Sequence, residues 1–510
     1  MKKSTVKNTV VKSAFIVTLL SAFERSLGFL YRIVLSRLIG AEGMGIYQIS
    51  LSLFALFLTI GTGGIPVTLS RFIAKNKTEK NIQEERQNIG AGILLSLLLT
   101  LPVVAVLLPF AHKLPFLFSD HRAIPVFRIL LSGLVFCSLF AVLRGAFWGN
   151  KNFFIPALIE LAEETVMVIV GVLLLRGSTT PLSGATLAGV AVLISYLFSF
   201  TTSAICFFIF GGRISAPKKR LKPLFNATLP ITCVRGASAL VNSAIAVLLP
   251  AMLIKTGVSQ AEALKLFGVA SGMAMPVLFV PSTIIGSLAL VLVPELSGDY
   301  HAQNKSRLFY NIERGLRFSA LFSLFLLPLF FTLGDKIGAL AFNSALAGEY
   351  IKTGSWVLLP MSLSMISTTI LNSIGFERQT FLFYFVGTSG TLLCILLLPP
   401  LCGAYAYIVG LGVSFTLNAL CNFIWLSKKC DGFFRKFGKR LAVKSTVALL
   451  LCLPLRLYGK LCVALFSKLF SPILSLLFST LCLTLVSFLS YWLCGLFSLD
   501  KLLKKRRKKE

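Results

Sequence analysis

The stretch IGAGILLSLLLTLPVVAVLLPFA, residues 89–111, is predominantly apolar and contains no charged side chain. A helix that crosses the hydrocarbon core of a bilayer needs about 20 such residues. The run is therefore long enough to cross a membrane, and it decides the class of fold expected for the rest of the chain.

The composition of the whole chain supports the same class. Of its 510 residues, 56% are hydrophobic and only 14% are charged, and the mean hydropathy is +0.85. A water-soluble protein carries about 25% charged residues. A soluble fold cannot cover this much apolar surface, so we expect lipid to be the solvent for most of the chain.

Comparable runs recur along the chain and predict an all-α membrane protein with about fourteen transmembrane helices. Lys2, Lys3 and Lys7 precede the first run, as in a signal peptide, but no small-residue cleavage site follows. We therefore expect a retained first helix. The expected spans are 11–38, 45–73, 89–111, 123–147, 154–175, 181–210, 224–254, 265–294, 313–333, 348–374, 380–399, 402–426, 441–465 and 469–497.

Basic residues are distributed unevenly between the two sides of this topology. With the N-terminus inside, 34 Lys and Arg residues fall in inside segments and 11 in outside segments. Because Lys and Arg concentrate in cytoplasmic loops, both termini are expected in the cytoplasm. This asymmetry also accounts for the net charge of +31 without nucleic acid as a partner.

Two landmarks recur at nearly the same offset. GIPVTLS, with Pro66, is matched by LVPELS, with Pro294, 228 residues later, and the turn at Gly149 by the turn at Gly375, 226 residues later. A parallel six-helix repeat is expected, with substrate held between two rocking lobes. The expected domains are 1–222 (N-lobe, helices 1–6), 223–427 (C-lobe, helices 7–12) and 428–510 (helices 13–14 and a basic cytoplasmic tail).

The run LGFLYRIVLSRLIGAEGMGIYQ (27–48), followed by GIPVTLSRFIA (64–74), resembles the stage V sporulation protein B-like branch of the polysaccharide flippases. That superfamily also holds the MurJ-type lipid II flippases and the MATE drug exporters. The resemblance implies two lobes around a central cavity and a lipid-pyrophosphate-linked oligosaccharide as cargo. Further matching stretches are LRGAFWGNKNFFIPALIELAEE (143–164), LPITCVRGASALVNSA (229–244), GMAMPVLFVP (272–281) and LVPELS (292–297).

Charged residues at bilayer depth are expected to face a cavity or a partner. Arg25 and Arg32 are seven residues apart on one face of the first helix, next to Glu24, while Arg235 and Asn242 share a face of the seventh. Together they predict a basic chamber between the lobes that binds pyrophosphate, because arginine offers bidentate donors to phosphate oxygens. The alternative is a static ion pair, in which Glu24 or another acid neutralises the arginines.

The MurJ-type flippases carry essential arginines in their first helix, and Arg25 aligns with one of them. Tyr31 occupies the apparent position of the second, with Arg32 next along. Those flippases also have a basic residue in helix 8, whereas this chain has no Lys or Arg between Lys265 and Lys305. Arg235 is then the substitute for that missing basic residue.

The fifth expected helix carries three acids, Glu160, Glu163 and Glu164, of which Glu164 matches an acid of the family. They are expected either to bind a coupling cation or proton, or to pair with the arginines. The chain has three His and no CxxC pair, so no metal site and no cofactor are expected.

The predicted function is therefore a monomeric flippase, not an enzyme, that moves a lipid-linked oligosaccharide such as lipid II or a related undecaprenyl-pyrophosphate glycan by alternating access. A MATE-like cation-coupled drug exporter is the alternative, and it is expected to have an acidic cavity. A membrane glycosyltransferase or polymerase is disfavoured because it needs carboxylates or a metal in sizeable loops, and the loops here are short.

Overall fold

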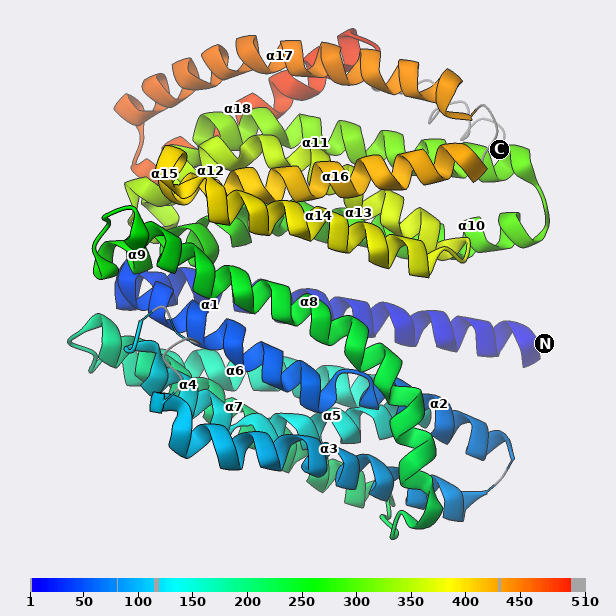
Figure 1. Ribbon diagram of the computed structural model, residues 1–510. Helices are drawn as coiled ribbons and strands as arrows, with labels where there is room; N and C mark the ends of the chain where they lie inside the picture. The colour runs from blue at the N-terminus through cyan, green and yellow to red at the C-terminus, as the bar shows by residue number, and fades with distance from the viewer. Residues whose placement is uncertain (1, 80, 114–117, 119, 430–432, 497–510) are drawn as a thin grey trace. The chain divides into compact units, whose positions relative to one another are not determined.

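The computed structural model describes residues 2–79, 81–113, 118, 120–429 and 433–496 (Figure 1). Every regular element in these ranges is a helix, which confirms the predicted all-α fold. Contacts between the helices divide the chain into two compact units, Met1–Gly268 and Val269–Glu510. The predicted lobe boundaries, which rest on the sequence repeat, stay a prediction.

The first unit consists of nine helices joined mostly by short turns. They are α1 (Lys2–Thr62), α2 (Ile65–Thr78), α3 (Ile82–Phe110), α4 (Ala123–Ser132), α5 (Leu134–Gly149), α6 (Phe154–Leu175), α7 (Pro181–Ile209), α8 (Leu221–Lys255) and α9 (Gln260–Phe267).

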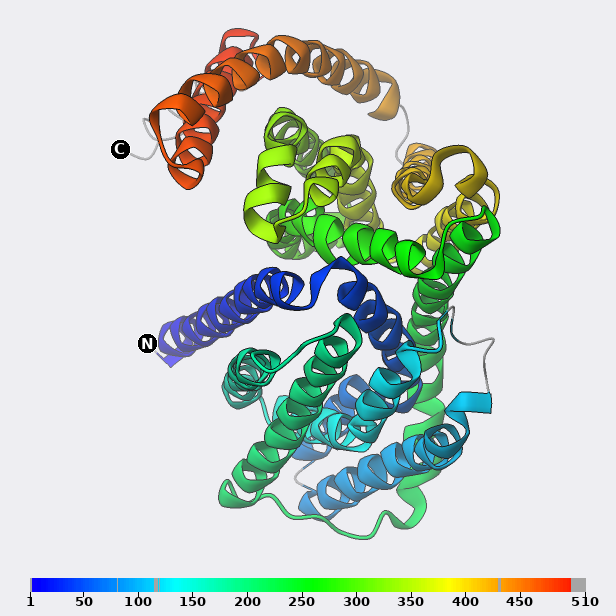
Figure 2. The same cartoon turned by 90° about the vertical axis from the view of Figure 1, so that its left-hand side faces the viewer.

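Helix α1 is two helices in series. At Gly40 the backbone has φ 70° and ψ 178°, a conformation that a residue with a Cβ atom rarely adopts. The chain turns there, and Figure 2 shows the parts before and after Gly40, here called the first and second halves of α1, running in different directions. The first half carries Glu24, Arg25 and Arg32, and the second half leads into α2.

A core between α2 and α5 fixes the position of the first unit's charged helices. Ile65 and Leu69 of α2 are buried together with Val142 and Ala146 of α5. The two helices meet at Gly145, where an added Cβ atom would lie 2.8 Å from the Cα atom of Pro66. This close approach holds α5, and with it the neighbouring Arg144, against the start of α2.

The second unit also has nine helices, and a π-helical turn at Gly268–Ala274 precedes them. They are α10 (Met275–His301), α11 (Lys305–Phe342), α12 (Ala345–Gly354), α13 (Leu358–Ser373), α14 (Glu377–Leu397), α15 (Pro399–Cys402), α16 (Ala406–Lys429), α17 (Phe433–Leu469) and α18 (Pro472–Leu493).

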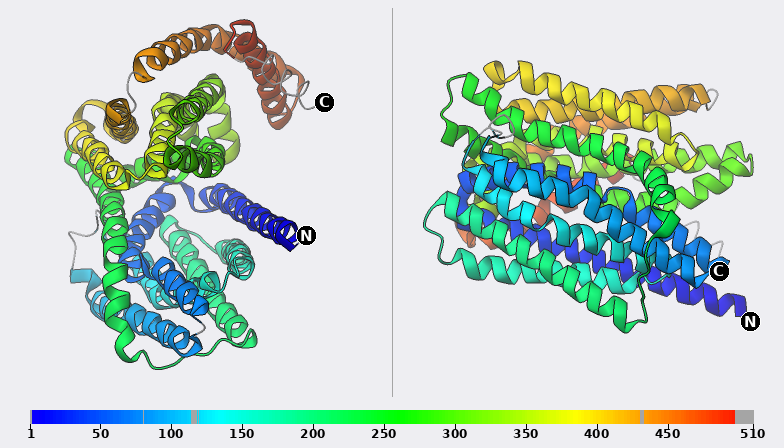
Figure 3. Two further views of the ribbon diagram at one scale, coloured as in Figure 1. Left: turned by 90° about the vertical axis from the view of Figure 1, so that its right-hand side faces the viewer. Right: turned by 60° about the horizontal axis from the view of Figure 1, so that its bottom comes forward.

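The last two helices pack on α11 (Figure 3). Leu324 of α11 is buried together with Cys452 of α17 and Tyr491 of α18. The Tyr491 hydroxyl donates a hydrogen bond to the carbonyl of Leu324 at 2.8 Å, so even the polar tip of this buried side chain has a partner. Helices α17 and α18 are therefore integral parts of the second unit.

Eleven helices in the described ranges are long and apolar enough to cross a membrane, or twelve if the bent pair α4–α5 is one span. The predicted number of about fourteen is not confirmed by this count. Two features account for the difference. Helices α1 and α2 are counted together as one span, although the chain turns at Gly40. Helix α6 is not counted as a span, because it has three glutamates within 22 residues. The exact number of spans stays a prediction.

Candidate functional site

A polar cavity of about 260 Å³ lies inside the first unit, between α1, α5, α6 and α7. Four carboxylates and one guanidinium group reach its wall, an unusual density of charge among such apolar helices. The lining residues are Glu24, Leu58, Thr62, Cys137, Phe140, Ala141, Arg144, Glu160, Glu163, Glu164 and Tyr196.

The guanidinium group belongs to Arg144, which lies within α5. Its Nη1 atom is 2.6 Å from Oε1 of Glu160 in α6. Arg144 also packs over the rings of Phe140 and Trp148. The signal in the sequence was spacing: Arg144 and Glu160 lie at similar distances on either side of the turn at 150–153, and their long side chains meet there.

The other two acids of α6 point toward different neighbours. Glu163 lies near Ser199 of α7, whose hydroxyl donates to the carbonyl of Tyr196 at 3.1 Å. The carboxylate of Glu164 lies against Gly28 in the first half of α1, where an added Cβ atom would be 2.7 Å from its Oε1 atom. The structure thus brings the predicted acids of α6 together with Glu24 around one cavity. The sequence did not predict this grouping, because Glu24 and the acids of α6 lie on different helices.

Arg25 and Arg32 are exposed on the first half of α1. Arg25 is near enough to act electrostatically on Glu24, and Arg32 on Glu164. Neither arginine, however, makes an ion pair or hydrogen bond with any residue that the structure describes. The static ion pair considered from the sequence is therefore not formed in this conformation.

Arg235 and Asn242 are both exposed on α8. Arg235 donates a hydrogen bond to the carbonyl of Gly63, at the end of the second half of α1. Figures 2 and 3 show the second half of α1 running between its first half and α8. Within the first unit, Arg235 is therefore not brought to Arg25 and Arg32, and the role of these residues in one basic chamber stays a prediction.

No group of three or more His, Cys, Asp or Glu side chains within the described ranges has the arrangement of a metal site. The acidic cavity is therefore a set of carboxylates around a space rather than a preformed metal cage. Its chemistry suits a proton or a loosely held cation.

The sequence profile of the family described as "Polysaccharide biosynthesis protein" matches residues 10–298, more than half of the chain. The chain belongs to the polysaccharide biosynthesis protein family. The matched region includes the whole acidic cavity and both arginines of α1.

Among the relatives of this family member is stage V sporulation protein B of Bacillus subtilis. The two are 25% identical over 414 residues, which covers 76% of this chain and 79% of the relative. The similarity therefore extends beyond the first unit into the second.

Two solved structures share the fold at 15% sequence identity. The lipid II flippase MurJ in an inward closed conformation matches with a TM-score of 0.73 over 96% of this chain and 100% of MurJ. An inward-facing MATE family multidrug transporter of the MOP superfamily matches with a TM-score of 0.65 over 82% of this chain and 99% of the transporter. The chain thus has the fold of these two solved structures, and its many apolar helices are those of a multi-pass membrane protein.

Proposed function

We propose that this protein is a flippase that moves a lipid-linked oligosaccharide across the bacterial cytoplasmic membrane by alternating access. The cargo is lipid II or a related undecaprenyl-pyrophosphate glycan, and both termini lie in the cytoplasm. Membership of a polysaccharide biosynthesis family, similarity to stage V sporulation protein B and the fold of a lipid II flippase support this function. The protein works as a monomer and performs no covalent chemistry.

One observation carries the proposal. Arg25 and Arg32 are exposed on the first half of α1, seven residues apart, without an ion pair to a described residue. Keeping an arginine at bilayer depth costs at least about 2.5–3.5 kcal/mol on insertion scales. A transient anionic partner offsets that cost. The two planar guanidinium groups on one helix face can each bind phosphate oxygens in a bidentate way, which suits the two phosphates of a pyrophosphate group.

The test is a flipping assay in reconstituted vesicles with fluorescent lipid II. The fraction of label accessible to a membrane-impermeant quencher reports movement between leaflets. We expect the wild-type protein to equilibrate the label, and Arg25→Ala and Arg32→Ala to abolish movement. Arg176→Ala, an exposed basic residue at the end of α6, is the matched control and should leave the rate unchanged. Full activity in both α1 variants would refute the role of these arginines.

The acidic cavity also favours a second candidate function, cation-coupled drug export. MATE-like cation-coupled drug export was expected to need such a cavity, and Glu24, Glu160, Glu163 and Glu164 line one here. In a flippase the same acids of α6 are proposed to bind the coupling cation or proton. Vesicles that take up a cationic dye against a proton or Na⁺ gradient, and lose this uptake in Glu163→Gln and Glu164→Gln, would favour drug export. Lipid II movement that needs a gradient and these carboxylates would assign them to flippase coupling.

A further inference from the structure

Helix α8 crosses the break between α1 and α2 and binds two of the backbone groups that the break leaves without helical partners. Arg235 Nη1 donates to the carbonyl of Gly63 at 2.7 Å. The N–H of Gly64 donates to Thr232 Oγ1 at 3.1 Å. The break lies within a segment that is long and apolar enough to cross a membrane, where such groups need partners from a neighbouring helix.

The two partners match the polarity of the helix ends that they bind. The carbonyl end of a helix carries a partial negative charge and the N–H end a partial positive charge. Arg235 brings a cation to the carbonyl end of α1, and Thr232 offers an acceptor to the N–H end of α2. Hydrogen bonds with a charged donor are also stronger than neutral ones. Each residue therefore stabilises the helix end that it contacts.

The backbone of α8 comes so close to the break that the contact requires glycine at positions 63 and 64. An added Cβ atom on Gly63 would lie 3.2 Å from the Cα atom of Thr232, and one on Gly64 would lie 2.6 Å from the carbonyl oxygen of Thr228. Side chains at either position would push α8 away. The break is thus shaped to receive α8.

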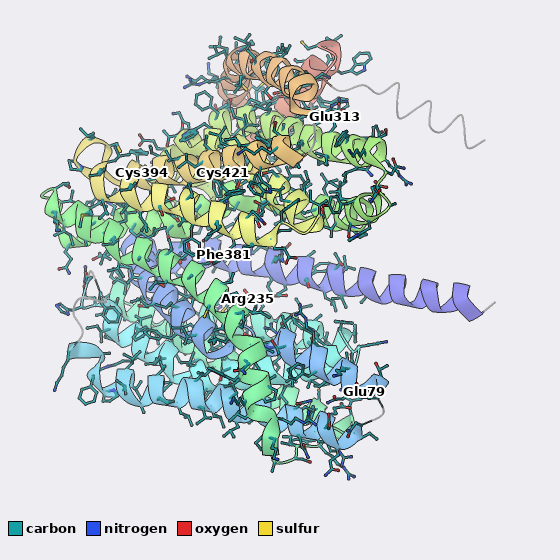
Figure 4. All side chains as sticks on the ribbon, turned by 45° about the vertical axis from the view of Figure 1, so that its right-hand side comes forward. Glu79, Arg235, Glu313, Phe381, Cys394 and Cys421 are labelled. Atoms are coloured by element: carbon teal, nitrogen blue, oxygen red, sulfur yellow. The ribbon has the colours of Figure 1, made fainter. Side chains whose placement is uncertain are left out.

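The contact lies between a proline-containing part of α8 and the wall of the acidic cavity. Helix α8 contains Pro230, which removes a helical hydrogen bond and favours a kink. Figure 4 shows α8 bending near the labelled Arg235. On the other side of the break, Thr62 lines the acidic cavity. The residue that Arg235 binds is therefore the immediate neighbour of a cavity-wall residue.

We propose that Arg235 and Thr232 form a releasable clasp on the α1–α2 break. In this role Arg235 is a positioning residue, which holds Thr62 and the cavity wall in the conformation described here rather than binding cargo. The opening of the clasp during transport rests on the proposed function; the clasp itself does not.

The first experiment measures the clasp in the purified full-length protein by hydrogen–deuterium exchange of a peptide that contains Gly63–Leu69. Thr232→Val and Arg235→Met each remove one hydrogen bond with little change in side-chain size. Since such a bond contributes about 0.5–1.5 kcal/mol, exchange should rise about two- to tenfold. Thr232→Ser and Arg235→Lys keep the bonding group and should stay near wild type.

Ser243→Ala is the matched control, because Ser243 also donates from α8 to a carbonyl of α1, that of Ser52 at 2.6 Å, away from the break. It should leave exchange at Gly63–Leu69 unchanged. Unchanged exchange in both Thr232→Val and Arg235→Met would overturn the clasp, as would an equal rise in Ser243→Ala.

The second experiment separates positioning from cargo binding in the vesicle assay. A positioning role lowers the maximal rate of Arg235→Met and Thr232→Val alike, with the half-saturating cargo concentration unchanged. A selective rise in that concentration for Arg235→Met, without the same change in Thr232→Val, would overturn the positioning role and make Arg235 a cargo ligand. If the wild-type protein moves no lipid II but the exchange pattern holds, the clasp stands and the proposed function fails.

Discussion

Arg144 Nη1 lies 2.6 Å from Glu160 Oε1, and this ion pair joins α5 to α6 across the turn at 150–153. It is the one cation–anion contact on the wall of the acidic cavity among the described residues. It leaves Glu24, Glu163 and Glu164 as the carboxylates without an ion pair there. The pair thus decides which acids are available to a proton or cation.

Breaking this pair should destabilise the protein. Removing one partner of a fully buried pair costs about 3–5 kcal/mol, but the Arg144 and Glu160 side chains are 30% and 23% exposed. Water offsets part of the loss, so we expect about 1–3 kcal/mol for Arg144→Met. The measurement is the apparent melting temperature in detergent. Arg144→Met combined with Glu160→Gln should recover most of the loss, because no unpaired charge remains.

Lys265→Met provides the control, because Lys265 pairs with Glu262 on an exposed surface, where the side chains are 49% and 46% accessible. Such a pair contributes at most about 1 kcal/mol. A melting temperature that falls as far for Lys265→Met as for Arg144→Met would contradict the special status of the cavity pair.

Lysine at position 25 or 32 should restore transport only in part. Lysine keeps the positive charge of Arg25 or Arg32 but lacks the planar guanidinium group, which can bind two phosphate oxygens at once. The rate of lipid II movement should therefore rank arginine, then lysine, then alanine, while insertion and melting temperature stay the same.

The double variant Glu24→Gln/Arg25→Ala distinguishes cargo binding from a static pair. If Arg25 only neutralised Glu24, removing both charges would restore transport to the wild-type rate. We expect the double variant to stay inactive, because no ion pair joins these residues in the described conformation.

Topology can be tested with a reporter enzyme that is active only outside the cytoplasm. A fusion after Leu499, in a tail outside the described residues, should be silent if both termini are cytoplasmic. A fusion after Gly177, between α6 and α7, should be active if α6 spans the membrane despite its three glutamates. A silent Gly177 fusion or an active Leu499 fusion would mean that the number of spans differs from fourteen.

Helices α17 and α18 lie outside the predicted repeat. We expect them to form either a groove that binds the lipid tail or a support that stabilises the second unit. Truncation after Cys430 should stop transport under the groove hypothesis, while the remaining chain still inserts. Because the truncation also exposes the Leu324 environment, folding must be verified by melting temperature. A folded, truncated protein that moves lipid II at the full rate would contradict the groove.

The amino-acid sequence alone determined the all-α membrane fold, the approximate helix ranges and the family. Runs of about 20 apolar residues can satisfy their backbone in lipid only as helices, so local composition is sufficient for these conclusions. Sequence spacing also placed Arg25 and Arg32 on one face of one helix, because positions seven apart coincide on a helical surface.

Only the tertiary structure decided which charges share a cavity and which backbone groups need side-chain partners. Arg144 meets Glu160, and Glu164 meets Gly28, across helix pairs whose contacts depend on packing rather than on local periodicity. Arg235 was predicted as a cargo ligand from its charge and depth, yet its hydrogen bond goes to Gly63. That partner became visible only once α8 was seen to cross the break between α1 and α2, since the partners of a helix end come from whichever helix packs beside it.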